Sequence, residues 1–331
     1  FREDALPGAV LTRVAASHIR VGTFQYFAAR RDGEGVRILA DHAIARHDPA
    51  AAEAASPYRA FYEGVVARQA ALVARWMLVG FVHGVMNTDN CSISGETIDY
   101  GPCAFMEAYD PATVFSSIDS FGRYAYGNQP RIAQWNLARL VECLLPLFDE
   151  SQDEAVAFAQ SALDGFAPAF ERVWTTGLRA KIGLATEQDA DTALIQSLLE
   201  TMAAQKADFT LTFRRLCDAA EDGAADVRVS RLFIDPASFA PWAVSWRARL
   251  AQEPGTPAVR AAAMRAVNPA IIPRNHRVEA ALAAATQSGD LGPFEALLEA
   301  IAHPFEEHPD HTPYTLPARE EERVTRTFCG T

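Results

Sequence analysis

Apolar side chains recur at helical spacing over most of the chain, and this pattern limits the possible folds more than any other feature. One such stripe begins at Phe61 and ends at Val79, with Gln69 as its one polar interruption. Residues three or four positions apart share one face of an α-helix, so the stripe predicts a helix with one buried side. The same period recurs in residues 135–147, 155–174 and 190–216. The tryptophans on such stripes are predicted to be core, namely Trp76, Trp135, Trp174, Trp242 and Trp246.

Two stretches break the helical period. Residues 8–15 alternate in the manner of a strand and are followed by Ser17, which is predicted to cap a helix running through Phe27. Residues 91–101 alternate again, with Gly95 as the turn of a short hairpin. We therefore predict the fold class α+β, with a mostly helical body and a small β-element at residues 80–103.

Composition and charge exclude several classes of function. The net charge of −12 makes general binding to nucleic acid or to an anionic membrane improbable. Apolar runs such as 76–85 are too short to cross a bilayer. The five cysteines are unevenly spaced and form no CxxC pair, which favours a reducing compartment, and we expect a cytoplasmic monomer. The sequence opens on Phe1 rather than Met, so we expect a chain truncated at its N-terminus.

The residues that could carry chemistry are concentrated in one stretch and the triplet after it. Residues 81–90 read FVHGVMNTDN, and Asp99-Tyr100-Gly101 follows nine residues after Asn90. A Mg²⁺ ion bound to nucleotide phosphates takes hard oxygen ligands from the protein. Asn90 and Asp99 can supply such oxygens, and they lie on either side of the predicted hairpin. Asp89 supplies a further carboxylate that the metal does not require, so it is free to accept a proton.

This order is similar to that of the protein kinases, in which a catalytic-loop Asn and the Asp of an Asp-Phe-Gly triplet hold the metals. His83-Gly84-Val85 takes the place of the kinase His-Arg-Asp triplet, and Val85 cannot accept a hydroxyl proton. As a kinase the chain would be a pseudokinase, with Asp89 as the nearest replacement base. Asp and Asn are also common in structural loops, and spacing alone favours that interpretation.

Five long segments add a family resemblance. They are PGAVLTRVAASHIRVGTFQYFA, HGVMNTDN, SISGETIDYGP, GRYAYGNQP and QWNLARL, at residues 7–28, 83–90, 92–102, 122–130 and 134–140. Each resembles a signature of the SelO (selenoprotein O) family of protein adenylyltransferases. The resemblance implies a protein-kinase-like fold, present as the C-terminal lobe and part of the N-lobe. Its implied parts are an N-lobe remnant at 1–30, a helical lobe at 31–300 with the catalytic hairpin at 80–103, and an irregular tail at 301–331.

The resemblance also implies an activity. SelO proteins transfer AMP from ATP to Ser, Thr or Tyr hydroxyls of proteins, and the implied metal is Mg²⁺ or Mn²⁺. Asn90 and Asp99 match the metal ligands, with Asp99 also approaching the nucleotide, and Asp89 matches the proton acceptor. Arg13 and Arg20 match arginines that hold the ATP phosphates. Taken alone, these two arginines read equally well as surface side chains.

The chain departs from the family in two respects. The glycine-rich stretch and phosphate-binding Lys that precede the first motif in the family have no counterpart here, since Lys181 and Lys206 are the only lysines. Cys329 matches a redox-active cysteine near the family's C-terminus. Some family members pair that cysteine with a second one, but the residue at the second position here is Phe115, which cannot form a disulfide. Cys103 is the only cysteine nearby, so we expect a Cys103–Cys329 disulfide less than the family's own pairing.

Three functions therefore stay open from the sequence. The leading one is a metal-dependent protein adenylyltransferase. A non-catalytic kinase-like scaffold with a vestigial nucleotide site is the alternative, and a metal-dependent hydrolase using the same carboxylates is a weaker third. Tyr124 and Asn128 are candidates for a protein-substrate groove or for packing.

Overall fold

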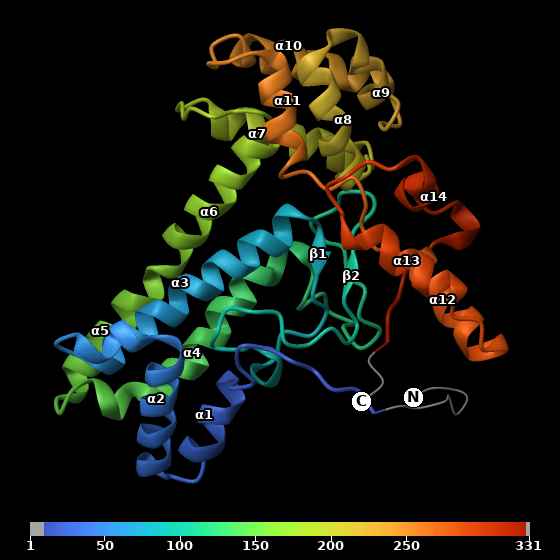
Figure 1. The fold of residues 1–331 in the computed structure, drawn as a ribbon. Coiled ribbons are helices and arrows are strands. Elements are labelled where there is room, and N and C mark those ends of the chain that lie inside the picture. The colour runs from blue at the N-terminus through green and yellow to red at the C-terminus, as the bar shows by residue number, and fades with distance from the viewer. Residues whose placement is uncertain (1–9, 329–331) are drawn as a thin grey trace.

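A computed structural model describes residues 10–328 of the protein, and the fold is mostly helical with one small sheet (Figure 1). The longer helices of the N-terminal half are α1 (Val21–Ala28), α2 (Gly33–His47), α3 (Pro57–Leu78), α4 (Gln129–Phe148), α5 (Gln152–Asp164) and α6 (Phe166–Lys181). Those that follow are α7 (Asp191–Ala204), α8 (Phe209–Glu221), α9 (Asp226–Ser230), α10 (Phe239–Leu250), α11 (Pro257–Arg265), α12 (Asn275–Ser288), α13 (Gly292–Ala302) and α14 (Thr312–Thr315). This confirms the predicted mostly helical α+β class.

Helix α3 is the centre of the body and packs against both α4 and α6. Figure 1 shows these three helices side by side, with α1 and α2 below them. In the predicted apolar stripe the first members, from Phe61 to Leu72, are buried together with Gln69, whereas Trp76 and Val79 at its end are half-buried. Pro57 begins the helix, where a missing N–H costs nothing. Gly80, with φ of 75°, turns the chain into the sheet directly after it.

The sheet consists of β1 (Phe81–Val82) and β2 (Ala104–Phe105), which run antiparallel. Phe81 pairs with Phe105, and Val82 pairs with Ala104. The two strands close the ends of the segment that carries the HGVMNTDN and DYG motifs. β1 lies within the predicted β-element at residues 80–103, whereas β2 lies directly after the end of that range.

The N-terminal prediction is wrong in part. Residues 10–15 form no strand, and Val10, Leu11 and Val14 are exposed. Alternation alone does not make a strand, because a strand needs a neighbour to receive its backbone hydrogen bonds, and in the described part of the chain this segment has none. The helix after it exists but begins at Val21, and the side chain of Ser17 accepts a hydrogen bond from the Ile19 amide instead of capping it.

Two of the longer helical predictions each contain a break. The stretch 155–174 is divided between α5 and α6 at Gly165, and 190–216 is divided between α7 and α8 near Lys206, whose φ is 50°. The prediction that every tryptophan is core is wrong for Trp135, which is 38% exposed. It packs at the surface between Arg123 and Arg139, so its apolar face is covered by guanidinium groups instead of by the core.

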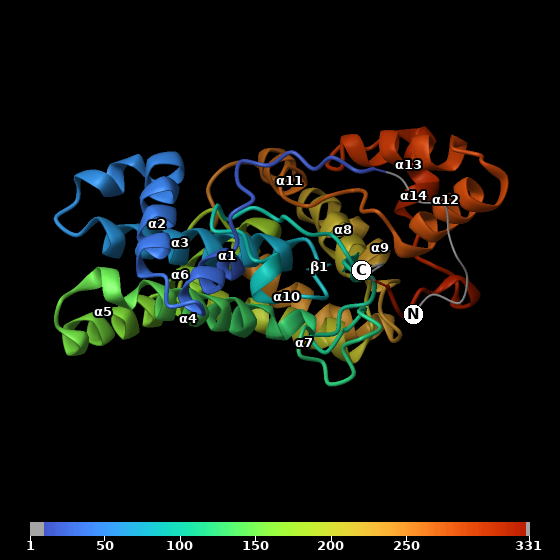
Figure 2. The same cartoon turned by 90° about the horizontal axis from the view of Figure 1, so that it is seen from below.

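Helices α7–α11 form one end of the molecule, and α12–α14 project beside them (Figures 1 and 2). Figure 2 shows α2 and α5 at the opposite end from α12–α14. A buried ion-pair network fixes the α7–α10 region, since Arg249 contacts Asp191 at 2.7 Å and Glu253 at 2.5 Å. Within residues 10–328, no helix is both long enough and apolar enough to span a bilayer.

Candidate active site

The predicted hairpin forms by one antiparallel bridge, between Cys91 and Thr97. Gly95 makes its turn with φ of 75°, and a Cβ on Gly95 would lie 2.7 Å from the Cβ of Arg68. Both the dihedral angle and the lack of space therefore require glycine. Asn90 leads into one arm and Asp99 follows the other, so the two candidate metal ligands leave the hairpin at the same end.

Polar side chains of α3 hold this hairpin in place. The Gln69 amide donates to the Ser92 carbonyl at 2.5 Å, the Arg68 guanidinium donates to the Ile93 carbonyl at 3.1 Å, and the Trp76 indole donates to the Thr97 hydroxyl at 2.8 Å. The polar interruption in the α3 stripe thus has a structural reason. A buried amide has to be hydrogen-bonded, and Gln69 is bonded to the backbone of the candidate site.

Helix α4 braces the loop before the hairpin. The Gln129 side chain accepts from the His83 amide at 3.0 Å and donates to the Phe81 carbonyl at 3.0 Å. The Asn136 amide donates to the Met86 carbonyl at 2.9 Å. Both side chains are completely buried. Sequence reasoning missed their role, although amides on the apolar face of a helix were a visible signal.

His83 is a structural residue of this loop. Its ring is buried against Trp76, with the ring centroids 5.2 Å apart, and its Nδ1 accepts a hydrogen bond from the Val85 amide. Burial lowers the pKa of His83 to about 4, against an opposing effect of the Asp99 charge. His83 is therefore neutral at physiological pH. Next to it, a Cβ on Gly84 would lie 2.8 Å from the Pro102 carbonyl oxygen, which leaves no space for the Arg of a kinase triplet.

Asp89 lies in a short 3₁₀ turn, Thr88–Asn90, and is exposed. Its carboxylate makes no hydrogen bond or ion pair with any residue between 10 and 328. The side chain instead lies over Gly22 in the first turn of α1, where an added Cβ would come within 2.0 Å of Oδ1. The N-terminal end of a helix favours a neighbouring negative charge. Asp89 is thus a positioned carboxylate that is open to solvent.

Asn90 and Asp99 are each held by one atom and leave another oxygen available. The Asn90 amide nitrogen donates to the Val85 carbonyl at 3.0 Å, which directs its oxygen away from that bond. Oδ1 of Asp99 accepts from the Gly101 amide at 3.0 Å, and Oδ2 lies 3.8 Å from Nη1 of Arg13. One amide oxygen and one carboxylate oxygen are the donor types that Mg²⁺ and Mn²⁺ take in proteins. The residues present therefore fit such an ion.

The two candidate phosphate arginines both lie beside the hairpin. Arg13 donates to the Ile98 carbonyl and faces Asp99, so its segment is fixed to the second arm. Arg20 forms an antiparallel bridge with Ser92 on the first arm, and the next residue, Val21, donates to the Cys91 carbonyl at 3.0 Å. Nε of Arg20 is buried and has no hydrogen-bond partner in the described part of the chain.

The end of the tail also reaches this region. Thr327 donates its amide to the Phe115 carbonyl at 2.7 Å and its hydroxyl to the Pro102 carbonyl. Cys329 lies outside the described residues, so the Cys103–Cys329 disulfide stays a prediction. Cys103 is bonded to none of the described cysteines, and burial raises the pKa of its thiol to about 11.

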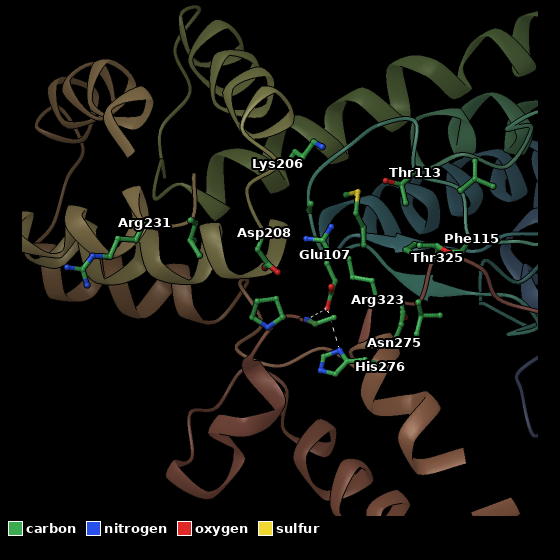
Figure 3. Close-up of a pocket in the computed structure, with 17 residues that line it drawn as sticks. Glu107, Thr113, Phe115, Lys206, Asp208, Arg231, Asn275, His276, Arg323 and Thr325 are labelled. Atoms are coloured by element: carbon green, nitrogen blue, oxygen red, sulfur yellow. Dashed lines mark hydrogen bonds and ion pairs between the residues drawn. The ribbon is translucent and has the colours of Figure 1, made fainter. Parts of the chain in front are cut away.

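A separate cavity of about 520 Å³ lies between the body and the tail (Figure 3). Its carboxylates are already paired, because Asp208 and Glu107 both contact the buried guanidinium of Arg274. In Figure 3 the Arg231 side chain points away from Glu107. The cavity contains none of the candidate site residues and presents no free set of acidic ligands.

Comparison with known proteins agrees with the motifs. The family model described as protein adenylyltransferase SelO matches residues 1–302. The chain belongs to the SelO family. Proteins called protein nucleotidyltransferase YdiU from Bradyrhizobium sp. strain ORS 278, Bradyrhizobium diazoefficiens and Methylorubrum extorquens are 62%, 63% and 62% identical to it. These matches cover 100% of this chain and 67%, 67% and 68% of the three relatives.

Membership of the SelO family identifies the chain as a protein nucleotidyltransferase. The family description, a protein adenylyltransferase, implies ATP as the nucleotide donor and proteins as the acceptors. It also implies a kinase-like fold for this mostly helical chain. The motifs that indicated the family from sequence, HGVMNTDN and SISGETIDYGP, are those that the buried amides of α3 and α4 hold together.

Proposed function

We propose that the chain transfers AMP from ATP to Ser, Thr or Tyr hydroxyls of proteins, in a metal-dependent reaction with Asp89 as the base. The observation that carries this proposal is the Asp89 carboxylate itself. It is exposed, has no partner among the described residues, and is adjacent to Asn90 on a loop that buried side chains hold still. A carboxylate placed in this way can accept the proton of an attacking hydroxyl, directly or through one water.

Asn90 and Asp99 are the residues that would hold Mg²⁺ or Mn²⁺. When bound, the ion offsets negative charge on the phosphates. For the chain itself, the Val85–Asn90 and Gly101–Asp99 hydrogen bonds fix the two side chains before a ligand arrives. Preorganised ligands of this kind need no rearrangement during the reaction.

Arg13 and Arg20 are the residues that would contact the ATP phosphates, with Asp99 also near the nucleotide. Arg20 supports this role because its buried Nε is unsatisfied in the described part of the chain, and a buried N–H group without an acceptor is costly. Arg13 has an acidic neighbour at 3.8 Å, and an anionic nucleotide would compete with that neighbour for it. Arg13 contacts the second arm of the hairpin, and Arg20 pairs with the first.

The kinase-like division of the chain is part of the proposal. Residues 1–30 would belong to the nucleotide-binding lobe, 31–300 to the helical lobe and 301–331 to the tail. Val85 stands where a kinase has its catalytic Asp, and an apolar side chain cannot accept the hydroxyl proton. This supports transfer of AMP instead of transfer of phosphate as in a kinase. Asp89 is then the base of a different reaction on a related framework.

The proposal is tested by following each phosphate of ATP. The chain is incubated with a protein acceptor and ATP labelled on the α- or the γ-phosphate, and the 62%-identical Bradyrhizobium relative serves as a positive control. We expect label from the α-phosphate on protein and none from the γ-phosphate. Label from the γ-phosphate on protein would show a kinase, and free AMP without labelled protein would show a hydrolase.

The second candidate function is a non-catalytic scaffold, and the Arg13–Asp99 contact favours it. An arginine that is already satisfied by the Ile98 carbonyl and Asp99 could close a vestigial site. This function predicts no ATP binding by calorimetry with Mg²⁺ or Mn²⁺, and no difference between the wild type and Asp99→Ala. Binding that Asp99→Ala weakens would exclude it.

A further inference from the structure

A groove of about 570 Å³ lies between the loop at residues 118–124 and the first turns of α4. Its walls combine large apolar side chains with arginines, and its principal members are Ile118, Phe121, Arg123, Tyr124, Arg131 and Trp135. Phe121 is 98% exposed and Ile118 is 72% exposed. Exposed aromatic and aliphatic side chains gathered at one groove mark an interaction surface more often than scattered ones do.

The groove is positively charged on an acidic protein. The guanidinium of Arg123 lies 4.8 Å from the ring centroid of Trp135, and Arg131 is exposed on α4. No carboxylate within residues 10–328 forms an ion pair with either arginine, and neither guanidinium donates a hydrogen bond there. Asp119 also lines the groove, but it accepts the amides of Arg123 and Tyr124 at 2.9 and 2.8 Å. Two arginines are thus free to bind carboxylates, although the chain has a net charge of −12.

The groove is a fixed surface. The Asn128 amide donates to the Gly122 carbonyl at 2.7 Å, and the Tyr126 hydroxyl donates to the Met77 carbonyl at 2.7 Å. Stacking on Trp135 holds Arg123 without using its hydrogen-bond donors. The binding groups are therefore arranged before a partner arrives, which lowers the entropic cost of binding.

One helix connects the groove to the candidate active site. Ile132 and Trp135 of α4 line the groove, while Asn136 of the same helix donates to the Met86 carbonyl in the loop that leads to Asp89. Asn136 also donates to the Ile132 carbonyl at 3.0 Å. A polypeptide bound in the groove would therefore be held on the helix that braces the loop of the proposed base.

We propose that this groove binds an acidic, extended segment of the protein substrate, with carboxylates on Arg123 and Arg131 and an apolar side chain against Ile118 and Phe121. The inference rests on the proposed function, because it names the substrate feature that the same site would select. Charge complementarity identifies the occupant, since two arginines that no described carboxylate pairs, at an apolar groove, match an acidic segment with an apolar residue. Binding of this kind should weaken as salt rises.

The test measures binding without nucleotide, so it does not depend on catalysis. A fluorescein-labelled peptide rich in glutamate, with one leucine and one serine, is titrated with the chain by fluorescence anisotropy. A second peptide carries glutamine in place of every glutamate. We expect the acidic peptide to bind and Arg123→Glu and Arg131→Glu each to weaken it about tenfold, from a lost ion pair and a new repulsion. Arg172→Glu on α6, an exposed arginine without an ion pair in the described part of the chain, should bind as the wild type does.

Three results would overturn the proposal. Equal affinity for the glutamine peptide would show that charge does not select the partner. Wild-type affinity in both groove variants would show that the peptide binds elsewhere. If light scattering finds that the wild type self-associates and that Arg131→Glu is monomeric, the groove binds a second copy of the chain. Transfer of AMP to the serine of the bound peptide is measured separately, so that failure of the chemistry is distinguished from failure of the groove.

Discussion

The Asp89 carboxylate lies directly over Gly22, so closely that a methyl group on Gly22 would come within 2.0 Å of Oδ1. These residues are far apart in the sequence. They meet because the chain at Arg20 pairs with Ser92 and delivers the first turn of α1 to the Thr88–Asn90 turn. Asp89 can therefore occupy this position only because Gly22 has no side chain.

Gly22→Ala is expected to abolish most activity while leaving the fold intact. The added methyl displaces the end of a flexible aspartate side chain, which is cheap, and alanine gains about 1 kcal/mol over glycine within a helix. The displaced carboxylate would no longer meet the acceptor hydroxyl, and a small misplacement of a catalytic group costs about a hundredfold in rate. The measurement is the rate of AMP transfer beside a thermal melt.

Gly33→Ala is the matched control for this variant. Gly33 is the first residue of α2, and a Cβ there would meet nothing within 4 Å. It should keep full activity. Equal activity in Gly22→Ala and Gly33→Ala would mean that the position of Asp89 over Gly22 has no role in the reaction.

Gln129→Met should destabilise the chain. It removes the two hydrogen bonds to His83 and Phe81 at nearly constant volume and leaves a buried amide and a buried carbonyl without partners. We expect a loss of about 2–4 kcal/mol in the free energy of unfolding, measured with urea. Gln196→Met on α7 removes one exposed bond to Glu200 and should cost much less. Similar losses in the two variants would contradict the bracing role of α4.

Because His83 is buried and neutral, we expect the stability of the chain to fall as pH falls. Its pKa is about 4 in the folded chain, below its ordinary value of 6.5, so between these values the unfolded chain binds more protons. The contribution of neutral His83 to the free energy of unfolding is therefore present above about pH 6.5. It is lost as pH falls, and the free energy of unfolding drops by about 2 kcal/mol between about pH 7.5 and pH 5. His83→Asn keeps an acceptor for the Val85 amide but cannot titrate. The wild type should lose more stability than this variant over that range, and identical losses would be inconsistent with a buried neutral His83.

We expect the substitution of the buried Lys181 by an apolar residue to stabilise the chain. Its ammonium group lies 4.3 Å from the Phe213 ring centroid, and burial lowers its pKa to about 7 from 10.5. Folding at neutral pH therefore costs the energy of removing a proton or of burying a charge. Lys181→Met should raise the free energy of unfolding by roughly 1–4 kcal/mol at pH 7.5, with a smaller gain above pH 10. Lys206→Met, at an exposed position, should change little.

The sequence predicted local features well. The α3 stripe, the Gly95 turn and the helix near residues 21–28 follow from patterns within a few residues, and the structure contains all three. Residues 10–15 failed as a strand because strand formation depends on a partner, which alternation within the segment cannot report. The division of 155–174 at Gly165 was missed because the apolar period continues across the break.

Long-range contacts were beyond the sequence patterns. Gln69 was visible as an exception in its stripe, but only the fold shows that its amide holds Ser92. The roles of Gln129 and Asn136, and the contact between Gly22 and Asp89, depend on residues that the chain brings together from distant positions. The family motifs located the candidate residues without stating what positions them.

We propose that Asp89, Asn90 and Asp99 form the site of AMP transfer. The most direct measurement is the intact mass of a protein acceptor after incubation with ATP, Mg²⁺ or Mn²⁺ and either the wild-type chain or Asp99→Asn. We expect an added adenylyl group with the wild type and none with Asp99→Asn. An added phosphoryl group, or equal adenylylation by both chains, would contradict it.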